Sequence, residues 1–456
     1  MQGPHEPHEV RLWPPAPDAH QAGMMKPRMC QDMMTASRLS ASLSAKVTNV
    51  DRRLLRLTVE NFRSLRKVSL PLGDLNVLVG PNGAGKTNVL EVFRFLADII
   101  RTDLEPALQS RQGFDEIVFR GGESNRAFIQ IGLTATWTTH SSPNAPDDYK
   151  LRITRRRVRG APLRLSRRET FQFKRTRGSG RRITIDGSRV TVADTRGTDQ
   201  AESETSIGIR PLSSGLSTLP RLVDEAGGTE VSAFADRLAS FRVFDVNVSA
   251  ARRAARVPRL DEFADDFLEL NEDASDLASF LFVLSRSHEE SWQRLIEDAT
   301  SVLPNLHDIR FDFPSGAARE VVVMLEETGL RSPTQLADAS YGTVRLLGLL
   351  ALLYDPNPPA LTCIEEIDHG LHPQALELLV ERLREASERS QFILATHSPA
   401  LADRLKPEEL IVCERLPDGS SAIPAISVAE VRRIVRQSEG LPLGELWFSG
   451  ALGGDL

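Results

Sequence analysis

The chain has 456 residues, of which 41% are hydrophobic and 26% charged, and its formal net charge is −6. These values are typical of a globular protein with room for two or three lobes, and no apolar run reaches the ~20 residues that a membrane span needs. Cys30, Cys363 and Cys413 lie far apart and form no CxxC pair, which argues against a zinc site or a disulfide framework. The N-terminus has no apolar secretory segment, so we expect a cytoplasmic protein.

Residues 1–51 are predicted to be a disordered tail, because they are rich in Pro, Met, His and Ser and show no periodicity. Several methionines in this stretch allow an alternative, in which the natural protein starts downstream and residues 1–33 do not belong to it. Ordered structure is expected from an alternating strand at Leu54–Asn61, followed by a buried strand at Leu75–Val79 and a helix from about Asn88. We assign residues 52–125 to the first part of a core domain.

From about residue 126 the hydrophobic pattern changes to strict alternation, which predicts an antiparallel meander. Its strands are expected at Phe128–Leu133, Leu151–Thr154, Phe171–Phe173 and Ile183–Ile185. Residues 196–215 are polar and predicted to be a loop. Helices at Leu277–Leu284 and Trp292–Leu303 and a strand at Glu320–Leu325 follow. We interpret residues 126–335 as an inserted lobe with a β part and a helical part.

Residues 336–456 return to alternating helices and strands and are expected to complete the core domain, which makes the fold class α/β. The predicted elements are a helix at Val344–Tyr354, strands at Leu361–Ile364 and Gln391–Ala395, a helix at Gln374–Ala386 between them, and short strands at Ile411–Glu414 and Ala422–Ile426.

One segment matches the phosphate-binding loop pattern GxxxxGK[ST] and lies between a predicted strand and a predicted helix. Its residues are Gly80, Pro81, Asn82, Gly83, Ala84, Gly85, Lys86 and Thr87. Glycines let backbone N–H groups turn inward at a helix N-terminus and bind an anion. In this pattern the lysine reaches the β and γ phosphates and the threonine hydroxyl binds Mg²⁺. We therefore expect ATP and Mg²⁺ as cofactors.

Three further motifs carry polar groups to the ends of predicted elements. The strand Leu361–Ile364 leads into Glu365, which we assign to the metal, and Glu366, which we assign as general base. The turn Ser340–Thr343 precedes an apolar helix and offers either a second anion site or an ordinary helix cap. His397 follows the strand Gln391–Ala395, where an imidazole can contact a γ-phosphate or the attacking water.

The order of these motifs resembles the RecF, SMC and OLD group of ATP-binding-cassette-type ATPases, and most closely the stand-alone RecF-like ATPases of the "AAA family". Asn61–Leu65, Asp115–Gly122, Leu371–Pro373 and Leu443–Trp447 are also similar to segments of that group. The resemblance covers most of residues 52–456. It implies an ABC-type ATPase head with an inserted antiparallel β meander and a helical lobe.

The resemblance also implies a head-to-tail homodimer that sandwiches two ATP molecules. Ser340 and Gly342 of one subunit would then contact the γ-phosphate held by Lys86 of the other. The chain departs from the family pattern at Tyr341, where a polar residue is usual. It departs again at Ile367 and Asp368, where a Pro-Glu pair is common, and Gln109 and Gln112 are both candidates for the family's Q-loop glutamine.

Between Lys150 and Arg182 the chain carries fourteen lysines and arginines and one acid, Glu169. Such a cluster favours binding of a nucleic-acid backbone, with a solvated sheet face in an arginine-rich protein as the alternative. The candidate residues are Arg152, Arg155, Arg156, Arg157, Arg167, Arg168 and Arg175.

The sequence contains no long heptad run, and we find no motif of the nuclease module that is fused to OLD enzymes. We therefore expect an ATP-driven switch that acts on DNA in repair or antiviral defence, and a separate effector subunit as its partner. The alternative is an ATP-dependent switch that controls a protein partner or toxin without binding nucleic acid. A transporter ATPase is disfavoured by the long segment between the phosphate loop and the Ser340 turn.

Overall fold

The computed structural model describes residues 52–122, 126–156, 164–175, 180–194, 202–205, 209–221, 228–257, 269–314, 319–438 and 440–453. The predicted tail, residues 1–51, lies outside these ranges. The chain from Val50 to Leu456 forms one compact unit. No helix among the described residues is both long and apolar enough to cross a membrane.

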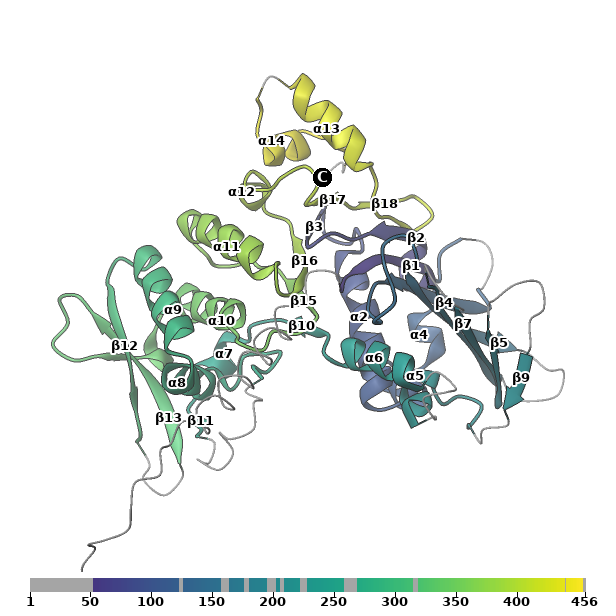
Figure 1. The fold of residues 1–456 in the computed structure, drawn as a ribbon. Coiled ribbons are helices and arrows are strands. Elements are labelled where there is room, and N and C mark those ends of the chain that lie inside the picture. Colours follow the sequence, from purple (N-terminus) through teal and green to yellow (C-terminus); the bar gives the residue numbers. More distant parts are fainter. Residues whose placement is uncertain are drawn as a thin grey trace, which may run out of the picture. The chain divides into compact units, whose positions relative to one another are not determined.

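The largest sheet has eight antiparallel strands in the order β2-β1-β4-β5-β6-β7-β8-β9 (Figure 1). Its strands are β1 (Leu54–Phe62), β2 (Leu65–Pro71), β4 (Phe128–Ala135), β5 (Asp147–Arg156), β6 (Arg164–Phe173), β7 (Arg181–Asp186), β8 (Arg189–Asp194) and β9 (Glu202–Thr205). The predicted meander is therefore present. It continues a sheet begun by β1 and β2, so the boundary predicted at residue 126 falls between strands of one sheet. The prediction of a loop over residues 196–215 misses β9.

A second sheet of five strands is entirely parallel, in the order β10-β15-β16-β3-β17. Its strands are β3 (Leu75–Val79), β10 (Arg242–Phe244), β15 (Leu361–Glu365), β16 (Gln391–Thr396) and β17 (Leu410–Val412). Parallel sheets are covered on both faces, which explains why these strands read as continuous apolar runs. Strand β10 lies within the segment predicted as an insertion and nevertheless joins this core sheet.

Helix α2 (Lys86–Arg101) lies between the two sheets, because its apolar residues share one core with inward-facing residues of both. The other helices on this side are α3 (Leu104–Gln109), α4 (Phe114–Ile117), α5 (Gly215–Thr218), the 3-10 turn η1 (Leu219–Arg221) and α6 (Gly228–Ala239). Figure 1 shows α2, α5 and α6 on one side of the eight-stranded sheet. That sheet therefore has an inner face packed against helices and an outer face.

A second core lies on the other face of the parallel sheet. It is built from α7 (Val248–Ala251), α8 (Leu277–Ser287), α9 (Glu289–Val302), α10 (Tyr341–Leu353), α11 (Pro373–Ala386), α12 (Pro399–Ala402), α13 (Val428–Gln437) and α14 (Leu443–Phe448). A small sheet of β11 (Ala255–Arg256), β12 (Leu306–Asp312), β13 (Glu320–Glu327) and β14 (Thr334–Gln335), followed by the 3-10 turn η4 (Leu336–Asp338), packs with α8 and α9.

The chain after β17 forms a short hairpin of β18 (Glu414–Arg415) and β19 (Ser421–Ala422). The predicted strand Ile411–Glu414 is thus divided between β17 and β18. The predicted strand Ala422–Ile426 is wrong beyond Ala422. A cis bond between Ile423 and Pro424 follows β19, and proline has no N–H to donate to a strand partner.

Candidate functional site

The loop Gly80–Thr87 joins the parallel strand β3 to the N-terminus of α2. No side chain caps this helix, and no acidic residue lies in its first turn. Gly83 and Gly85 have φ angles of 83° and 100°, a left-handed conformation that glycine adopts without strain. The helix N-terminus is therefore left with free N–H groups and a positive dipole end, which together favour a bound anion.

Close packing on the outside of this loop explains two of its glycines. A Cβ atom on Gly85 would lie 2.2 Å from Ser421 Oγ and 2.7 Å from Ser64 Oγ. A Cβ atom on Gly80 would lie 2.4 Å from the carbonyl oxygen of Cys413. The segments around Ser64 and β17–β19 thus press directly on the loop and fix its shape.

Lys86 extends back over the loop. Its Nζ donates hydrogen bonds to the carbonyl oxygens of Gly80, at 2.6 Å, and Pro81, at 3.0 Å. Burial lowers the pKa of Lys86, and nearby acidic groups including Glu366 act in the opposite direction. The ammonium group is therefore held beside the anion-binding N–H groups, where a phosphate would be its natural partner.

The loop opens into a pocket of 260 Å³ that collects side chains from four parts of the chain. Lys86 and Thr87 come from the start of α2, Glu365 and Glu366 from the end of β15, and His397 from the end of β16. The pocket is lined by Asn82, Gly83, Gly85, Lys86, Thr87, Asn88, Glu365, Glu366, Ala395, Thr396, His397 and Arg415. Because β3, β15 and β16 are parallel, their carboxyl ends meet at one edge of the sheet and bring these residues together.

Glu365 carries the clearest sign of a missing partner. Its Oε1 atom is buried and accepts no hydrogen bond from the residues that the structure describes. Burial raises the pKa of Glu365, while Arg94 lowers it. A cation would supply the missing partner, and the Thr87 hydroxyl lines the same pocket. Among the described residues no group of three His, Cys, Asp or Glu side chains could hold a metal alone, so Mg²⁺ here would depend on phosphate oxygens and water as well.

Glu366 differs from its neighbour in exposure and backbone. Its side chain is 57% exposed, and its φ angle is 46°, which is unusual for a residue other than glycine. One carboxylate oxygen lies 3.3 Å from His369 Nδ1. A carboxylate that water can reach, at the edge of this pocket, can accept a proton from a water molecule.

The predicted turn at Ser340 lies at the N-terminus of α10. Ser340 caps this helix, since its Oγ accepts a hydrogen bond from Thr343 N at 3.1 Å. Neither Ser340 nor Gly342 lines the pocket of its own chain. Ser340 and Tyr341 are exposed, and the Tyr341 ring packs against His369 with the ring centres 5.5 Å apart.

Two contacts join this turn to the acidic end of β15. A Cβ atom on Gly342 would lie 2.6 Å from the carbonyl oxygen of Gly370, so the two segments touch through backbone. Arg345, on the next turn of α10 and 3% exposed, donates hydrogen bonds to the carbonyl oxygens of Glu365 at 3.1 Å and Glu366 at 2.7 Å. Within one chain the Ser340 turn is therefore fastened to the two glutamates.

Sequence reasoning missed Arg415, which lines the pocket from the β18–β19 hairpin. Its Nη1 donates to the carbonyl oxygen of Gly83 at 3.4 Å, and no carboxylate of the described residues pairs with it. The hairpin is anchored by an ion pair between Asp418 and Arg66 at 2.6 Å. No motif marks Arg415, because its position depends on a hairpin that returns to the loop from 332 residues downstream. Neither Gln109 nor Gln112 lines this pocket.

The predicted arginine cluster is divided between the two faces of the large sheet. Arg167 is fully buried and lies 3.3 Å from the Glu169 carboxylate, so its assignment to a nucleic-acid surface is wrong. Side chains alternate along a strand, and this residue faces the inner side. Arg155 pairs with Asp115, and Arg175 pairs with Glu230 at 2.7 Å.

The remaining members of the cluster have separate environments. Arg152 stacks on the Phe128 ring at 3.7 Å, and Arg156 and Arg168 are exposed. Arg157 lies outside the described residues.

Comparison with known proteins gives a family match over residues 75–403, to a family described as "AAA domain, putative AbiEii toxin, Type IV TA system". The chain is also similar to three curated proteins over short segments. These are an OLD nuclease of Thermus scotoductus (49% identity over 57 residues), Structural maintenance of chromosomes protein 1 of Schizosaccharomyces pombe (37% over 71 residues) and the DNA replication and repair protein RecF of Psychromonas ingrahamii (35% over 83 residues).

The three segments cover 12%, 15% and 18% of this chain and 10%, 5% and 23% of the respective relatives. Among solved structures, an SMC head bound to the C-terminal winged-helix domain of ScpA is 13% identical. It matches 84% of this chain and 99% of its own, with a TM-score of 0.49. The SMC head domain of Thermotoga maritima, also 13% identical, matches 82% and 99% with a TM-score of 0.39.

Proposed function

Because the chain belongs to the AAA-domain family whose model spans residues 75–403, we propose that it hydrolyses ATP to ADP and phosphate in the pocket beside β3. The observation that carries this proposal is the meeting of a phosphate loop, two glutamates and His397 around one cavity of 260 Å³. Each group has a partner in a triphosphate, its metal ion or the attacking water.

The roles follow from position. The N–H groups at the start of α2 bind the β and γ phosphates, and Lys86 leaves its loop carbonyls to contact the same oxygens. Thr87 and Glu365 hold Mg²⁺, which supplies charge neutralisation at the phosphates. Glu366 orients the attacking water and accepts its proton, and His397 donates a hydrogen bond to the γ-phosphate.

A head-to-tail homodimer is the second part of the proposal. Ser340 and Gly342 are placed at a helix N-terminus and do not line the pocket of their own chain. A second subunit would bring this turn to the γ-phosphate held by Lys86, so that each ATP is enclosed by both chains. Hydrolysis would remove the γ-phosphate and release the dimer.

We propose DNA as the target, in repair or antiviral defence, with a separate subunit as effector. Support comes from the names of the relatives, which include a nuclease, a chromosome maintenance protein and a DNA replication and repair protein. The alternative is control of a protein partner or toxin without nucleic acid. The family description, which names a type IV toxin–antitoxin system, favours that alternative.

The test is the Glu366→Gln variant of the full chain, assayed for phosphate release and, by light scattering, for mass with and without ATP. We expect turnover to fall by about 10²–10⁴-fold. The variant should also remain dimeric in ATP, because it retains the phosphate loop and Lys86. Glu377→Gln, an exposed carboxylate on α11, is the matched control and should behave as wild type. Normal turnover in the Glu366 variant would refute the general-base assignment, and a monomer in ATP would refute the dimer.

A further inference from the structure

The outer face of the eight-stranded sheet is hollowed. A groove of 820 Å³ crosses strands β1, β4, β5, β6 and β7. We call this groove the trough. It is lined by Arg56, Thr58, Gly132, Leu133, Thr134, Asp148, Tyr149, Lys150, Arg168, Thr170, Gln172, Lys174, Arg182 and Thr184. It is separate from the pocket at the phosphate loop, since the two share no residue.

The register of the strands explains the hollow. Thr58, Gly132, Lys150, Thr170 and Thr184 are successive partners across five strands, so they form one row on the outer face. Apart from Lys150 this row is made of small side chains. A Cβ atom on Gly132 would lie 2.5 Å from Thr58 Oγ1, so a larger residue would not fit there.

The two flanking rows carry longer side chains, several of them charged. One row runs from Arg56 through Asp148 and Gln172 to Arg182. The other runs from Glu60 through Arg152 and Arg168 to Asp186, and of these Arg168 lines the trough. Consecutive outward rows are about 6.7 Å apart along a strand, so the flanking rows stand about 13 Å from each other. From β1 to β7 there are four strand spacings, or about 19 Å.

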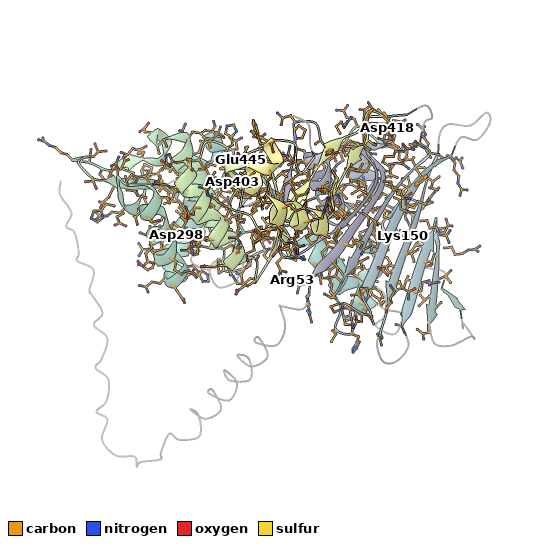
Figure 2. All side chains as sticks on the ribbon, turned by 90° about the horizontal axis from the view of Figure 1, so that it is seen from above. Arg53, Lys150, Asp298, Asp403, Asp418 and Glu445 are labelled. Carbon is orange, nitrogen blue, oxygen red and sulfur yellow. The ribbon has the colours of Figure 1, made fainter. Side chains whose placement is uncertain are left out.

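The trough has an excess of positive charge. Five cations and one carboxylate, Asp148, line it, and Asp148 is paired with Lys174. No carboxylate of the described residues pairs with the other four cations, Arg56, Lys150, Arg168 and Arg182. Lys150 lies on this sheet, on β5, near the middle of the row (Figure 2). A group of cations on one face that have no carboxylate partner is a binding surface for a polyanion.

We propose that the trough binds the sugar–phosphate backbone of single-stranded nucleic acid. In a B-form helix one strand carries a phosphate about every 3.4 Å of axis, and a stretched single strand spaces them more widely, so a path of about 19 Å accommodates at most about five phosphates. The hydroxyls of Thr170 and Thr184 on the floor add donors to phosphate oxygens. The lining includes the aromatic residue Tyr149, but its ring is buried on the opposite, inner face of the sheet. There it packs against Phe171, with the ring centres 4.9 Å apart. Without aromatic rings to stack on bases, the binding is independent of sequence.

The proposed contact rests on the proposed function, in which the protein acts on nucleic acid, and it lies on the outer face of the large sheet. Of the arginines predicted from the sequence to bind nucleic acid, Arg168 lines the trough. Lys150, Lys174 and Arg182 belong to the same basic segment of the sequence, whereas Arg56 is brought beside them by the pairing of β1 with β4.

The experiment measures the fluorescence anisotropy of a labelled 20-nucleotide oligothymidylate with the full chain, at 50 and 200 mM salt. The trough variant changes the exposed residues Lys150, Arg168 and Arg182 to Gln, and the control changes the exposed residues Arg331, Lys406 and Arg436 to Gln. If each trough cation neutralises one phosphate, the variant's log–log salt slope should be shallower than wild type by about 2. We expect its affinity at 50 mM salt to fall about tenfold or more, while the control keeps the wild-type affinity and slope.

A second variant, Thr184→Glu, places a negative charge on the floor and should also weaken binding. Equal binding by the wild type, both variants and the control would overturn the trough while leaving an action on nucleic acid intact. Absence of binding by the wild type would refute both. Preference for a 20-base-pair duplex over the single strand would contradict the single-stranded form of the proposal. ATP turnover without nucleic acid should be unchanged in the trough variants, which separates their outcome from that of the ATPase site.

Discussion

The chain has two places suited to phosphate groups, and they are built in different ways. The pocket beside β3 uses backbone N–H groups at one helix N-terminus, fixed by glycines that are contiguous in sequence. The trough uses side chains from separate strands, which the register places in three neighbouring rows on one face. A backbone site is specific for one small anion, whereas a group of side-chain cations suits a long polyanion.

The largest effect that we predict is on the free energy of unfolding. It tests whether Arg167 and Arg168 lie on opposite faces of the large sheet. Arg167→Met leaves the buried Glu169 without its ion-pair partner, although Ser214, Gly215 and Tyr149 still donate to it. We expect the free energy of unfolding to fall by about 3–5 kcal/mol. Arg168→Met, one residue away and exposed, should change it by less than about 0.5 kcal/mol. Urea denaturation measures both.

The pH dependence provides a second readout of the same variant. Burial raises the pKa of Glu169, and Arg167 opposes this rise. A carboxyl whose pKa is higher in the folded than in the unfolded chain destabilises the fold above its folded pKa, and this penalty disappears at low pH. The deficit of Arg167→Met should therefore be smaller at pH 5 than at pH 8. Equal deficits at both values would show that Glu169 is not the cause.

The next effect tests the backbone site. Gly85→Ala combines a φ angle of 100° with overlap on Ser421 and Ser64, so we expect ATP affinity to fall by about 100-fold, from roughly 1–2 kcal/mol of backbone strain plus displacement of the loop. Gly83→Ala has a φ angle of 83° but nothing within 4 Å of the new Cβ, and it should lose about tenfold from strain alone. Isothermal titration with a non-hydrolysable ATP analogue measures both. Oligothymidylate binding should be unchanged in the two variants.

The smallest effect concerns the side chain that joins the backbone site from the hairpin. Arg415→Gln removes the cation beside Gly83, and we expect ATP affinity to fall about tenfold, in the range of one charge-assisted hydrogen bond. Arg415→Lys should restore part of the loss by retaining the charge. An Arg415→Gln variant with wild-type affinity would show that the guanidinium stays on the loop carbonyl and does not contact phosphate.

The comparison also explains what could be predicted from the sequence. The pocket could be predicted from the sequence because Gly80–Thr87 is a local motif. The strands that lead to Glu365 and His397 also have apolar runs typical of a parallel sheet. Arg415 could not be predicted in this way, because it depends on a hairpin that returns to the loop from far along the chain. The trough could be predicted in part, since four of its five cations lie in the basic segment between Lys150 and Arg182 and Arg56 comes from a distant strand. A cluster of arginines in sequence does not reveal which strand face each one occupies. Arg167 and Arg168 illustrate this, since adjacent residues lie on opposite faces.

The hydrogen bonds from Arg345 to the backbone of the two glutamates connect the Ser340 turn with the proposed site of hydrolysis in the same chain. In a head-to-tail dimer, Ser340 would contact the partner's nucleotide, while Arg345 on the same helix holds the carbonyl oxygens of Glu365 and Glu366 at its own site. Occupancy of one site would then affect the backbone of Glu366, the proposed general base, at the other site. The rate of hydrolysis should then depend on ATP concentration in a sigmoidal way, with a Hill coefficient that approaches two. The proposed dimer would hydrolyse ATP when both of its sites are occupied and would be nearly inactive when one site is occupied.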